Sequence, residues 1–155
     1  MPDYRLRSAT LDDVEALVEH RLAMFTEMGT PLDAPVVRQL FRDWLLKMMP
    51  AGEYLAWVCE NGDGQVVAGA GITLLRWPPG PSPIASDRIA FVYNVYTDPA
   101  HRKHGLARRM MDAIHAWCAA HGVGALALNA APAARHLYET QGYQPAPSPM
   151  MWKMT

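Results

Sequence analysis

A β-hairpin followed by a strand, a helix and a further strand occupies the middle of the chain, and this succession constrains the fold most. The hairpin strands run from Tyr54 to Glu60 and from Val66 to Leu75, with a turn at Asn61 to Gly64 between them. The strand–helix–strand unit runs from Ile89 to Leu128. Strands joined through a helix pair in parallel, whereas hairpin strands pair antiparallel. The sequence therefore predicts a mixed sheet.

Further elements are expected on both sides of this unit. Apolar residues at helical spacing predict a helix from Thr10 to Gly29 and a second helix after Asp33. Tyr4 to Arg7 is expected to be a strand, Pro132 to Gln141 a helix, and Met150 to Met154 a final strand. The predicted order is β-α-α-β-β-β-α-β-α-β, which indicates an α/β (α+β) fold.

Size and charge limit the classes of function. The 155 residues predict a single domain over 1-155, long enough to build its own core. A net charge of -1 disfavours binding of nucleic acid over a broad surface. Hydrophobic residues make up 50% and charged residues 19%, which leaves apolar surface for a groove or a homodimer contact.

The sequence also bears on location. The longest mostly apolar stretch, Val66 to Leu75, is far shorter than the ~20 residues of a membrane span. The charged residues Asp3 and Arg5 near the start are untypical of a secretory signal. Cys59 and Cys118 lie far apart and in no metal spacing. We therefore expect a cytoplasmic protein with no membrane partner and no bound metal.

The segment from His101 to Arg109 carries four cations and no acid: Arg102, Lys103, Arg108 and Arg109. It precedes and opens a predicted helix, where the helix dipole favours acidic side chains. Gly105 and Ala107 let the backbone approach phosphate oxygens closely. The segment therefore predicts a bound anion. The alternative is a solvated basic turn in which Gly105 relieves strain.

Two runs of residues in the second half of the chain have the spacing of known motifs. The first is Asn94-Val95-Tyr96-Thr97-Asp98-Pro99, followed by Arg102-Lys103-His104-Gly105-Leu106-Ala107, which contains Arg, two residues, Gly, one residue and Ala. The second is Leu137-Tyr138-Glu139 with Gly142-Tyr143. The first run resembles motif A of the GNAT family of N-acetyltransferases, whose pattern is Arg or Gln, two residues, Gly, one residue, then Gly or Ala, and the second resembles motif B of that family. The resemblance implies a mostly antiparallel central sheet with a splayed parallel strand pair and helices on both faces.

The resemblance also implies a site for acetyl-CoA. The backbone of Lys103 to Arg108 would hold the pyrophosphate, and the backbone of Val95 to Thr97 would pair with the pantetheine arm. A backbone N–H near Asn94 to Tyr96 would polarise the thioester carbonyl, as in an oxyanion site. The implied cofactor-binding residues are Val95, Tyr96, Thr97, Arg102, Lys103, His104, Gly105, Leu106, Ala107, Arg108, Asn129 and Tyr138.

Acetyl transfer to an amine needs a base for the incoming ammonium and an acid for the leaving thiolate. The motif indicates Tyr138 as the acid, with packing of helix on sheet as the alternative. Glu27 and Asn94 are expected to face the acceptor. The candidate base is Glu27 or Glu53. Alternatively, both glutamates are surface acids and a water chain accepts the proton. Asn129 either contacts the pantetheine or caps the next helix.

Two remaining features have alternatives of their own. His101 and His104 favour a surface or ligand-facing pair over a metal site, because no third ligand is near. Arg135 either contacts the cofactor or the acceptor, or forms an ion pair at the surface.

The residues and the resemblance together predict an acyl-CoA-dependent N-acyltransferase that moves acetyl from acetyl-CoA to a primary amine. The acceptor would be a small molecule or a peptide. One alternative is a non-catalytic acyl-CoA sensor that has lost the acceptor pocket. The other, a nucleic-acid-binding module, is disfavoured by the net charge of -1.

Overall fold

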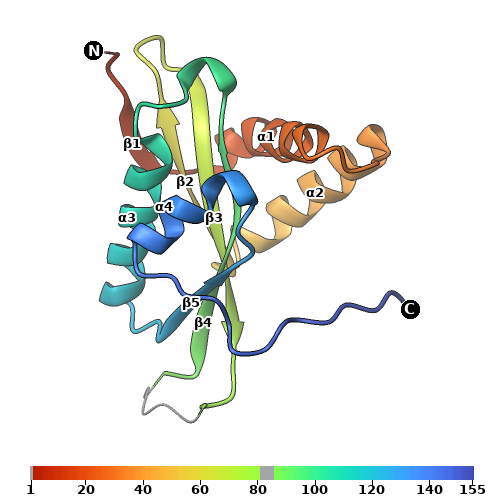
Figure 1. Cartoon of the computed structure of the whole chain (residues 1–155). Coiled ribbons are helices and arrows are strands. Elements are labelled where there is room, and N and C mark those ends of the chain that lie inside the picture. Colours follow the sequence, from red (N-terminus) through yellow and green to blue (C-terminus); the bar gives the residue numbers. More distant parts are fainter. Residues whose placement is uncertain (1, 81–85) are drawn as a thin grey trace.

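The computed structural model describes residues 2–80 and 86–155 and contains one five-stranded sheet in the order β1-β2-β3-β4-β5 (Figure 1). Neighbouring strands pair antiparallel except β4 and β5, which pair parallel. This arrangement confirms the predicted mixed sheet. The strands are β1 (Arg5–Ser8), β2 (Tyr54–Glu60), β3 (Val66–Arg76), β4 (Arg88–Thr97) and β5 (Ala125–Leu128).

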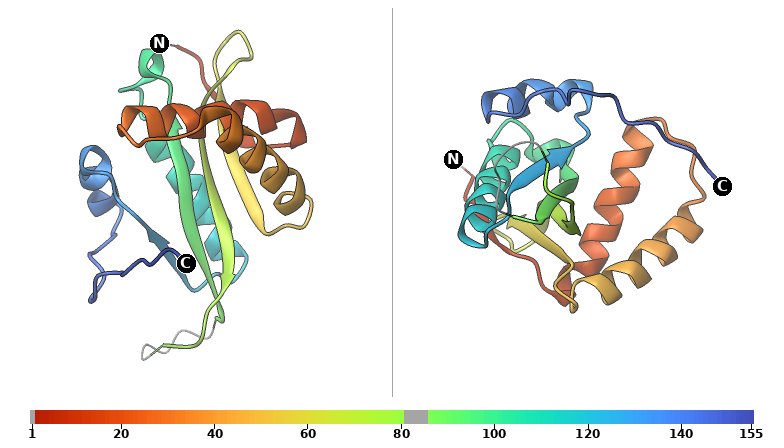
Figure 2. Two further views of the ribbon diagram at one scale, coloured as in Figure 1. Left: turned by 90° about the vertical axis from the view of Figure 1, so that its right-hand side faces the viewer. Right: turned by 90° about the horizontal axis from the view of Figure 1, so that it is seen from below.

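Helices cover both faces of the sheet, as predicted. On one face lie α1 and α2, whereas α3 and α4 lie on the other (Figure 2). Short 3-10 turns precede α1 and α4, at Leu11–Asp13 and Pro132–Ala134. The α-helices of the described residues are α1 (Val14–Glu27), α2 (Ala34–Met48), α3 (Leu106–Ala120) and α4 (Arg135–Thr140).

Local signals explain where the first two helices begin. The Thr10 side chain accepts from the backbone, and the Asp13 carboxylate accepts in return from the Thr10 N–H, which forms a capping box. The Asp33 side chain accepts from the Val36 N–H at the start of α2. Gly29, with a φ of 69°, follows the end of α1. The first helical segment therefore begins after Thr10 and ends before Gly29, and the second begins after Asp33, as predicted.

The alternation of side chains along β2 divides the core into two clusters. Tyr54, Ala56 and Val58 point toward α1 and α2. Trp57 and Cys59 point toward α3. Each face of the sheet therefore has its own apolar layer, and the end of β4 lies between them.

The predicted strand at Met150 to Met154 is wrong. These residues have no regular structure, and the tail extends away from the sheet (Figure 1). Met151 is 93% and Trp152 82% exposed. A strand needs a paired neighbour, and none of the five strands of the described sheet pairs with this segment.

The predicted surface loop from Trp77 to Asp87 lies partly outside the described residues. No helix among those that the structure describes is both long and apolar enough to cross a membrane.

Candidate active site

A cleft opens where β4 and β5 separate. Their pairing ends at Val92–Leu128, although β4 continues to Thr97. The last part of β4 therefore presents an edge that no described strand covers. The cleft has a volume of about 1090 Å³, and its walls are this edge of β4, the start of α3, the segment after β5, and α4. The predicted splayed strand pair is thus present.

A β-bulge lies in β4 beside the cleft. Gly69 pairs with Tyr96 and Gly71 pairs with Tyr93, so β4 carries one residue more than β3 between these pairs. Asn94 adopts a left-handed backbone with a φ of 58°. The bulge places Tyr93 and Asn94 on the same side of the sheet, toward α1 and α2. The bulge therefore interrupts the alternation of side chains along β4 at the point where β4 and β5 separate.

The N-terminus of α3 faces the same cleft. Gly105 and Lys103 have left-handed φ angles of 74° and 66°. The helix has no side-chain cap and no acid in its first turn, so its first N–H groups stay open to a ligand. A Cβ on Gly105 would meet no described atom within 4 Å. These features form a cradle that fits phosphate oxygens, with a positive helix end facing them.

Three of the four cations of the segment donate to described residues, and the fourth, Lys103, forms no salt bridge with one. Arg102 donates through Nη2 to both Glu27 carboxylate oxygens, at 2.7 and 2.8 Å. Arg108 donates to the Thr140 hydroxyl. Arg109 donates to the Tyr4 carbonyl. Lys103 forms no salt bridge with a described residue and lines the cleft, so it retains a free charge for a ligand.

Glu27 lies at the end of α1 on the cleft wall. Besides its pair with Arg102, its carboxylate accepts from the Tyr96 hydroxyl at 3.4 Å. Arg102 also donates through Nε to the Thr97 carbonyl, at 2.9 Å. Among the described residues that line the cleft, Glu27 is the one carboxylate. The structure therefore joins the end of α1 to the motif segment through one ion pair.

Tyr138 lies on α4 and is 6% exposed. Its side chain lines the cleft, and its ring contacts Tyr143 edge to face at 5.7 Å. The hydroxyl makes no hydrogen bond with any described residue. Burial raises the pKa of the hydroxyl above its ordinary value, so the group is a neutral donor near pH 7.

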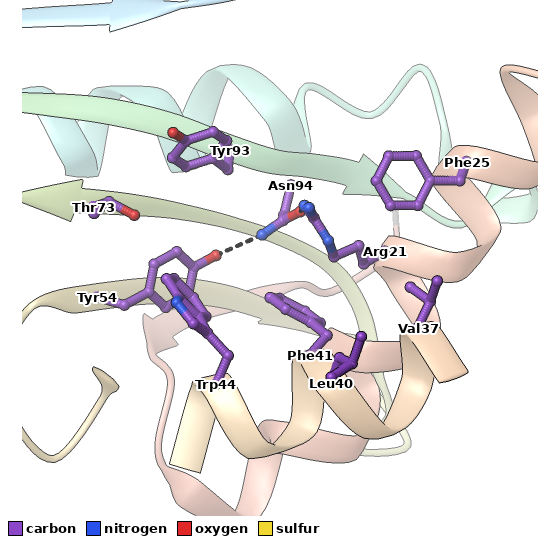
Figure 3. Close-up of a pocket in the computed structure, with 10 residues that line it drawn as sticks. All are labelled: Arg21, Phe25, Val37, Leu40, Phe41, Trp44, Tyr54, Thr73, Tyr93 and Asn94. Atoms are coloured by element: carbon purple, nitrogen blue, oxygen red, sulfur yellow. Dashed lines mark hydrogen bonds between the residues drawn. The ribbon is translucent and has the colours of Figure 1, made fainter. Parts of the chain in front are cut away.

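A second, smaller pocket lies between the helix pair and β3 and β4, with a volume of about 560 Å³ (Figure 3). Arg21 lies in its wall and donates to Asn94 Oδ1 at 2.6 Å, while Asn94 Nδ2 donates to the Tyr54 hydroxyl at 2.9 Å. The pocket and the cleft share Arg21, Phe25, Tyr93 and Asn94. The two spaces therefore meet at the bulge.

This pocket is lined mainly by apolar and aromatic side chains. The Arg21 guanidinium lies over the rings of Phe25 and Phe41, at 4.7 and 4.8 Å from their centroids. Burial lowers the pKa of Arg21, yet arginine stays protonated in proteins. Burial raises the pKa of Tyr54 to about 12, so this hydroxyl is neutral.

The amino-acid sequence of the chain matches the model of a known protein family. Residues 14–143 match the family model described as "Acetyltransferase (GNAT) family". This range extends from α1 to the residue pair after α4. The chain belongs to the GNAT acetyltransferase family. The GNAT fold supports acetyl transfer that depends on acyl-CoA, so the predicted resemblance is confirmed.

Solved structures agree with this assignment. A GCN5-related N-acetyltransferase from Ralstonia eutropha is 33% identical, with a TM-score of 0.89 over 98% of this chain and 99% of that chain. A predicted acetyltransferase from Clostridium acetobutylicum, solved with acetyl-CoA, is 21% identical, with a TM-score of 0.87 over 97% and 96%. Glucosamine-6-phosphate N-acetyltransferase from Arabidopsis thaliana is 15% identical, with a TM-score of 0.74 over 98% of both chains. No curated protein matches the sequence.

The predicted GNAT site residues mostly gather in the cleft. With the exception of His104, each predicted cofactor-binding or acceptor-facing residue lines it. The His104 Nδ1 lies 3.1 Å from the His101 carbonyl, and its ring packs against Tyr4. Asn129 lines the cleft and does not cap the next helix, whose N-cap is Ala131.

Three other predicted candidates lie elsewhere or have partners of their own. Arg135 donates to Glu139 in a surface ion pair. Glu53 lies exposed at the start of β2 and lines neither space. His101 Nδ1 lies 2.9 Å from the Tyr4 hydroxyl. Among the described parts of the chain, no three His, Cys, Asp or Glu residues form a group that could hold a metal.

Arg21, Tyr54 and Thr73 of the smaller pocket were not predicted from the sequence as site residues. A signal for Arg21 was present, because it lies four residues after Leu17 and four before Phe25 and so interrupts the apolar stripe of its helix. A cation on the buried face of a helix requires a polar partner or a ligand. Tyr54 and Thr73 carry no such signal, because both residue types are common in strands.

Proposed function

We propose that this GNAT protein transfers the acetyl group of acetyl-CoA to the nitrogen of a primary amine. The observation that carries the proposal is the bulge at Asn94, which lies where the cofactor-sized cleft and the smaller pocket meet. An acceptor in the pocket and a thioester in the cleft would both reach this point. A cleft without an adjoining pocket would instead favour a sensor.

Several residues of the chain would hold acetyl-CoA. The open N–H groups at the start of α3 fit the pyrophosphate, and Lys103 adds a cation beside them. The uncovered edge of β4 from Tyr93 to Thr97 can pair with the amides of an extended arm in the way an additional strand would. The bulged backbone near Asn94 offers an N–H for the charge that develops on the thioester oxygen.

The transfer needs proton movement at two atoms. The incoming ammonium loses one proton before its nitrogen attacks, the N–C bond forms as the C–S bond breaks, the nitrogen loses a second proton, and the sulfur gains one. Acetyl-CoA supplies the activated acetyl group. We assign the proton donor for the sulfur to Tyr138, because its hydroxyl is neutral, lines the cleft and has no other described partner.

Glu27 is the candidate base, and its pair with Arg102 defines the test. The substitution Glu27→Gln removes the charge and keeps the shape. If Glu27 accepts the proton, kcat falls and the acidic limb of the pH profile disappears. If Glu27 instead positions Arg102, the KM for acetyl-CoA rises while the pH profile keeps its form. The second result transfers the base role to a water chain.

The experiment that tests the function measures release of free CoA thiol from acetyl-CoA with a panel of primary amines. An amine-dependent release above the rate of spontaneous hydrolysis supports the proposal. Tight binding of acetyl-CoA without release for any amine would contradict it and favour the sensor. Binding of nucleic acid in place of acetyl-CoA would also contradict it.

A further inference from the structure

The smaller pocket holds a cation without a counter-charge. Arg21 forms no salt bridge with any described carboxylate, and no Asp or Glu lines the pocket. Its one described hydrogen bond goes to the amide oxygen of Asn94. A guanidinium has five N–H donors, so most of them remain available. A cationic acceptor would therefore meet a like charge here and no acid to offset its desolvation.

A second polar group in the pocket also lacks a partner. Thr73 is 9% exposed, and its buried hydroxyl oxygen has no hydrogen bond to any described residue. Buried hydroxyl groups are nearly always hydrogen-bonded. Figure 3 shows Thr73 at one end of the pocket, beside Tyr54 and Tyr93, and Arg21 with Phe25 at the other. The pocket thus offers a cation at one end and a hydroxyl at the other.

The space between these ends is apolar. Its wall on the α2 side consists of Val37, Leu40, Phe41 and Trp44. Leu40 is 65% exposed, although it lies on the helix face that points to the pocket. Such a wall favours a flat or bulky apolar group.

We propose that the acceptor is a free α-amino acid with an aromatic side chain that ends in a polar atom. Its carboxylate would bind Arg21, its ring would lie against α2, and its polar atom would bond to the Thr73 hydroxyl. The inference rests on the proposed acetyl transfer. In an α-amino acid the amine and the carboxylate share one carbon, so binding at Arg21 keeps the nitrogen beside the bulge, where pocket and cleft meet.

The test compares each amino acid with the amine that lacks its carboxylate. Wild-type protein with acetyl-CoA is assayed with L-tryptophan against tryptamine and with L-tyrosine against tyramine. We expect kcat/KM at least about tenfold higher for the amino acids, because a charge-assisted pair is lost with the carboxylate. Equal or higher values for the two amines would overturn the inference and leave the proposed function intact. Preference for the N-terminus of a Trp-Gly peptide over tryptophan would overturn it as well.

Variants assign the preference to particular residues. Arg21→Gln should lose the preference for tryptophan while tryptamine is still acetylated, and Arg21→Lys should restore part of it. Arg38→Gln is the matched control, since Arg38 is paired with Glu19 on the surface of α2. A preference that persists in Arg21→Gln would overturn the assignment. Should that variant fail to fold, the wild-type comparison still decides the substrate class.

Thr73→Val tests the other end of the pocket. It should raise the KM for L-tyrosine and L-tryptophan several-fold and leave the KM for L-phenylalanine unchanged, because phenylalanine has no polar atom to lose. An equal change for all three amino acids would overturn the role of Thr73. Failure of every amine and amino acid to release CoA would overturn the proposed function itself, which distinguishes that failure from the failure of the inference.

Discussion

Gly71→Ala is the substitution whose effect follows most directly from the geometry of the smaller pocket. A Cβ at Gly71 would lie 2.0 Å from the Tyr54 hydroxyl oxygen and 2.3 Å from Cζ. Tyr54 is 2% exposed and packs edge to face against Trp44, so its ring has little room to move. We therefore expect the ring to shift and its hydrogen bond with Asn94, 2.9 Å long in the wild type, to break.

The expected cost combines two effects. Overpacking of a core costs about 1–3 kcal/mol, and a lost buried hydrogen bond adds about 1 kcal/mol, which together give roughly 2–4 kcal/mol. For a chain of 155 residues, each kcal/mol lowers Tm by about 2–4 °C. The predicted decrease in Tm is therefore roughly 4–16 °C. The KM for the amine should rise in the same variant, because Asn94 also holds Arg21.

Calorimetric melting and steady-state kinetics measure both effects. Gly62→Ala is the control, because a Cβ there meets no described atom within 4 Å. In a Tyr54→Leu background, Gly71→Ala should cost much less than in the wild type. A Tm within about 1 °C of wild type for Gly71→Ala would refute the reasoning.

Three further substitutions test other parts of the site. Tyr138→Phe should lower kcat by about 10² in the CoA-release assay and leave Tm unchanged, and a smaller loss than about twofold would make Tyr138 a packing residue. Gly105→Val should raise the calorimetric Kd for acetyl-CoA at least about tenfold, and an unchanged Kd would refute the phosphate cradle. Arg7 holds the pKa of Asp13 below its ordinary value, so the stability from this pair is present above pH ~3.9 and is lost as pH falls through the folded-state pKa. Urea midpoints of Asp13→Asn should therefore vary less with acid pH, and parallel curves would contradict this origin.

Strands and helices with strong local signals were predictable from the sequence. The bounds of β2, Tyr54 to Glu60, were predicted to the residue, because its apolar and aromatic run lies between Gly52 and Asn61. The first helix begins with a capping box at Thr10, which depends on residues three positions apart. Such elements are encoded in neighbouring residues.

The bulge at Asn94 could not be placed in this way. Apolar and aromatic residues run through β4 on both sides of it, so no change of period marks the extra residue. The left-handed backbone of Asn94 is supported by its bonds to Arg21 and Tyr54, which are distant in the sequence. A tertiary network thus stabilises a local conformation that the sequence pattern does not reveal.

The ion pair of Glu27 could not be predicted from the sequence either. Arg102 was predicted to serve an anionic ligand, and Glu27 was predicted to face the acceptor. Their ion pair joins residues that meet only because α1 packs beside the end of β4. The apolar residues near the C-terminus led to a wrong prediction, because their composition favours a strand but no strand of the described sheet pairs with them.

The most direct test of acetyl transfer to an amine is mass spectrometry of the acceptor after incubation with acetyl-CoA labelled in the acetyl group. We expect a product that is heavier by one labelled acetyl group on nitrogen, formed in step with free CoA and reduced in Gly105→Val when acetyl-CoA is below saturation. Labelled acetate released as the sole product, or label that never leaves CoA with any amine or amino acid, would contradict it.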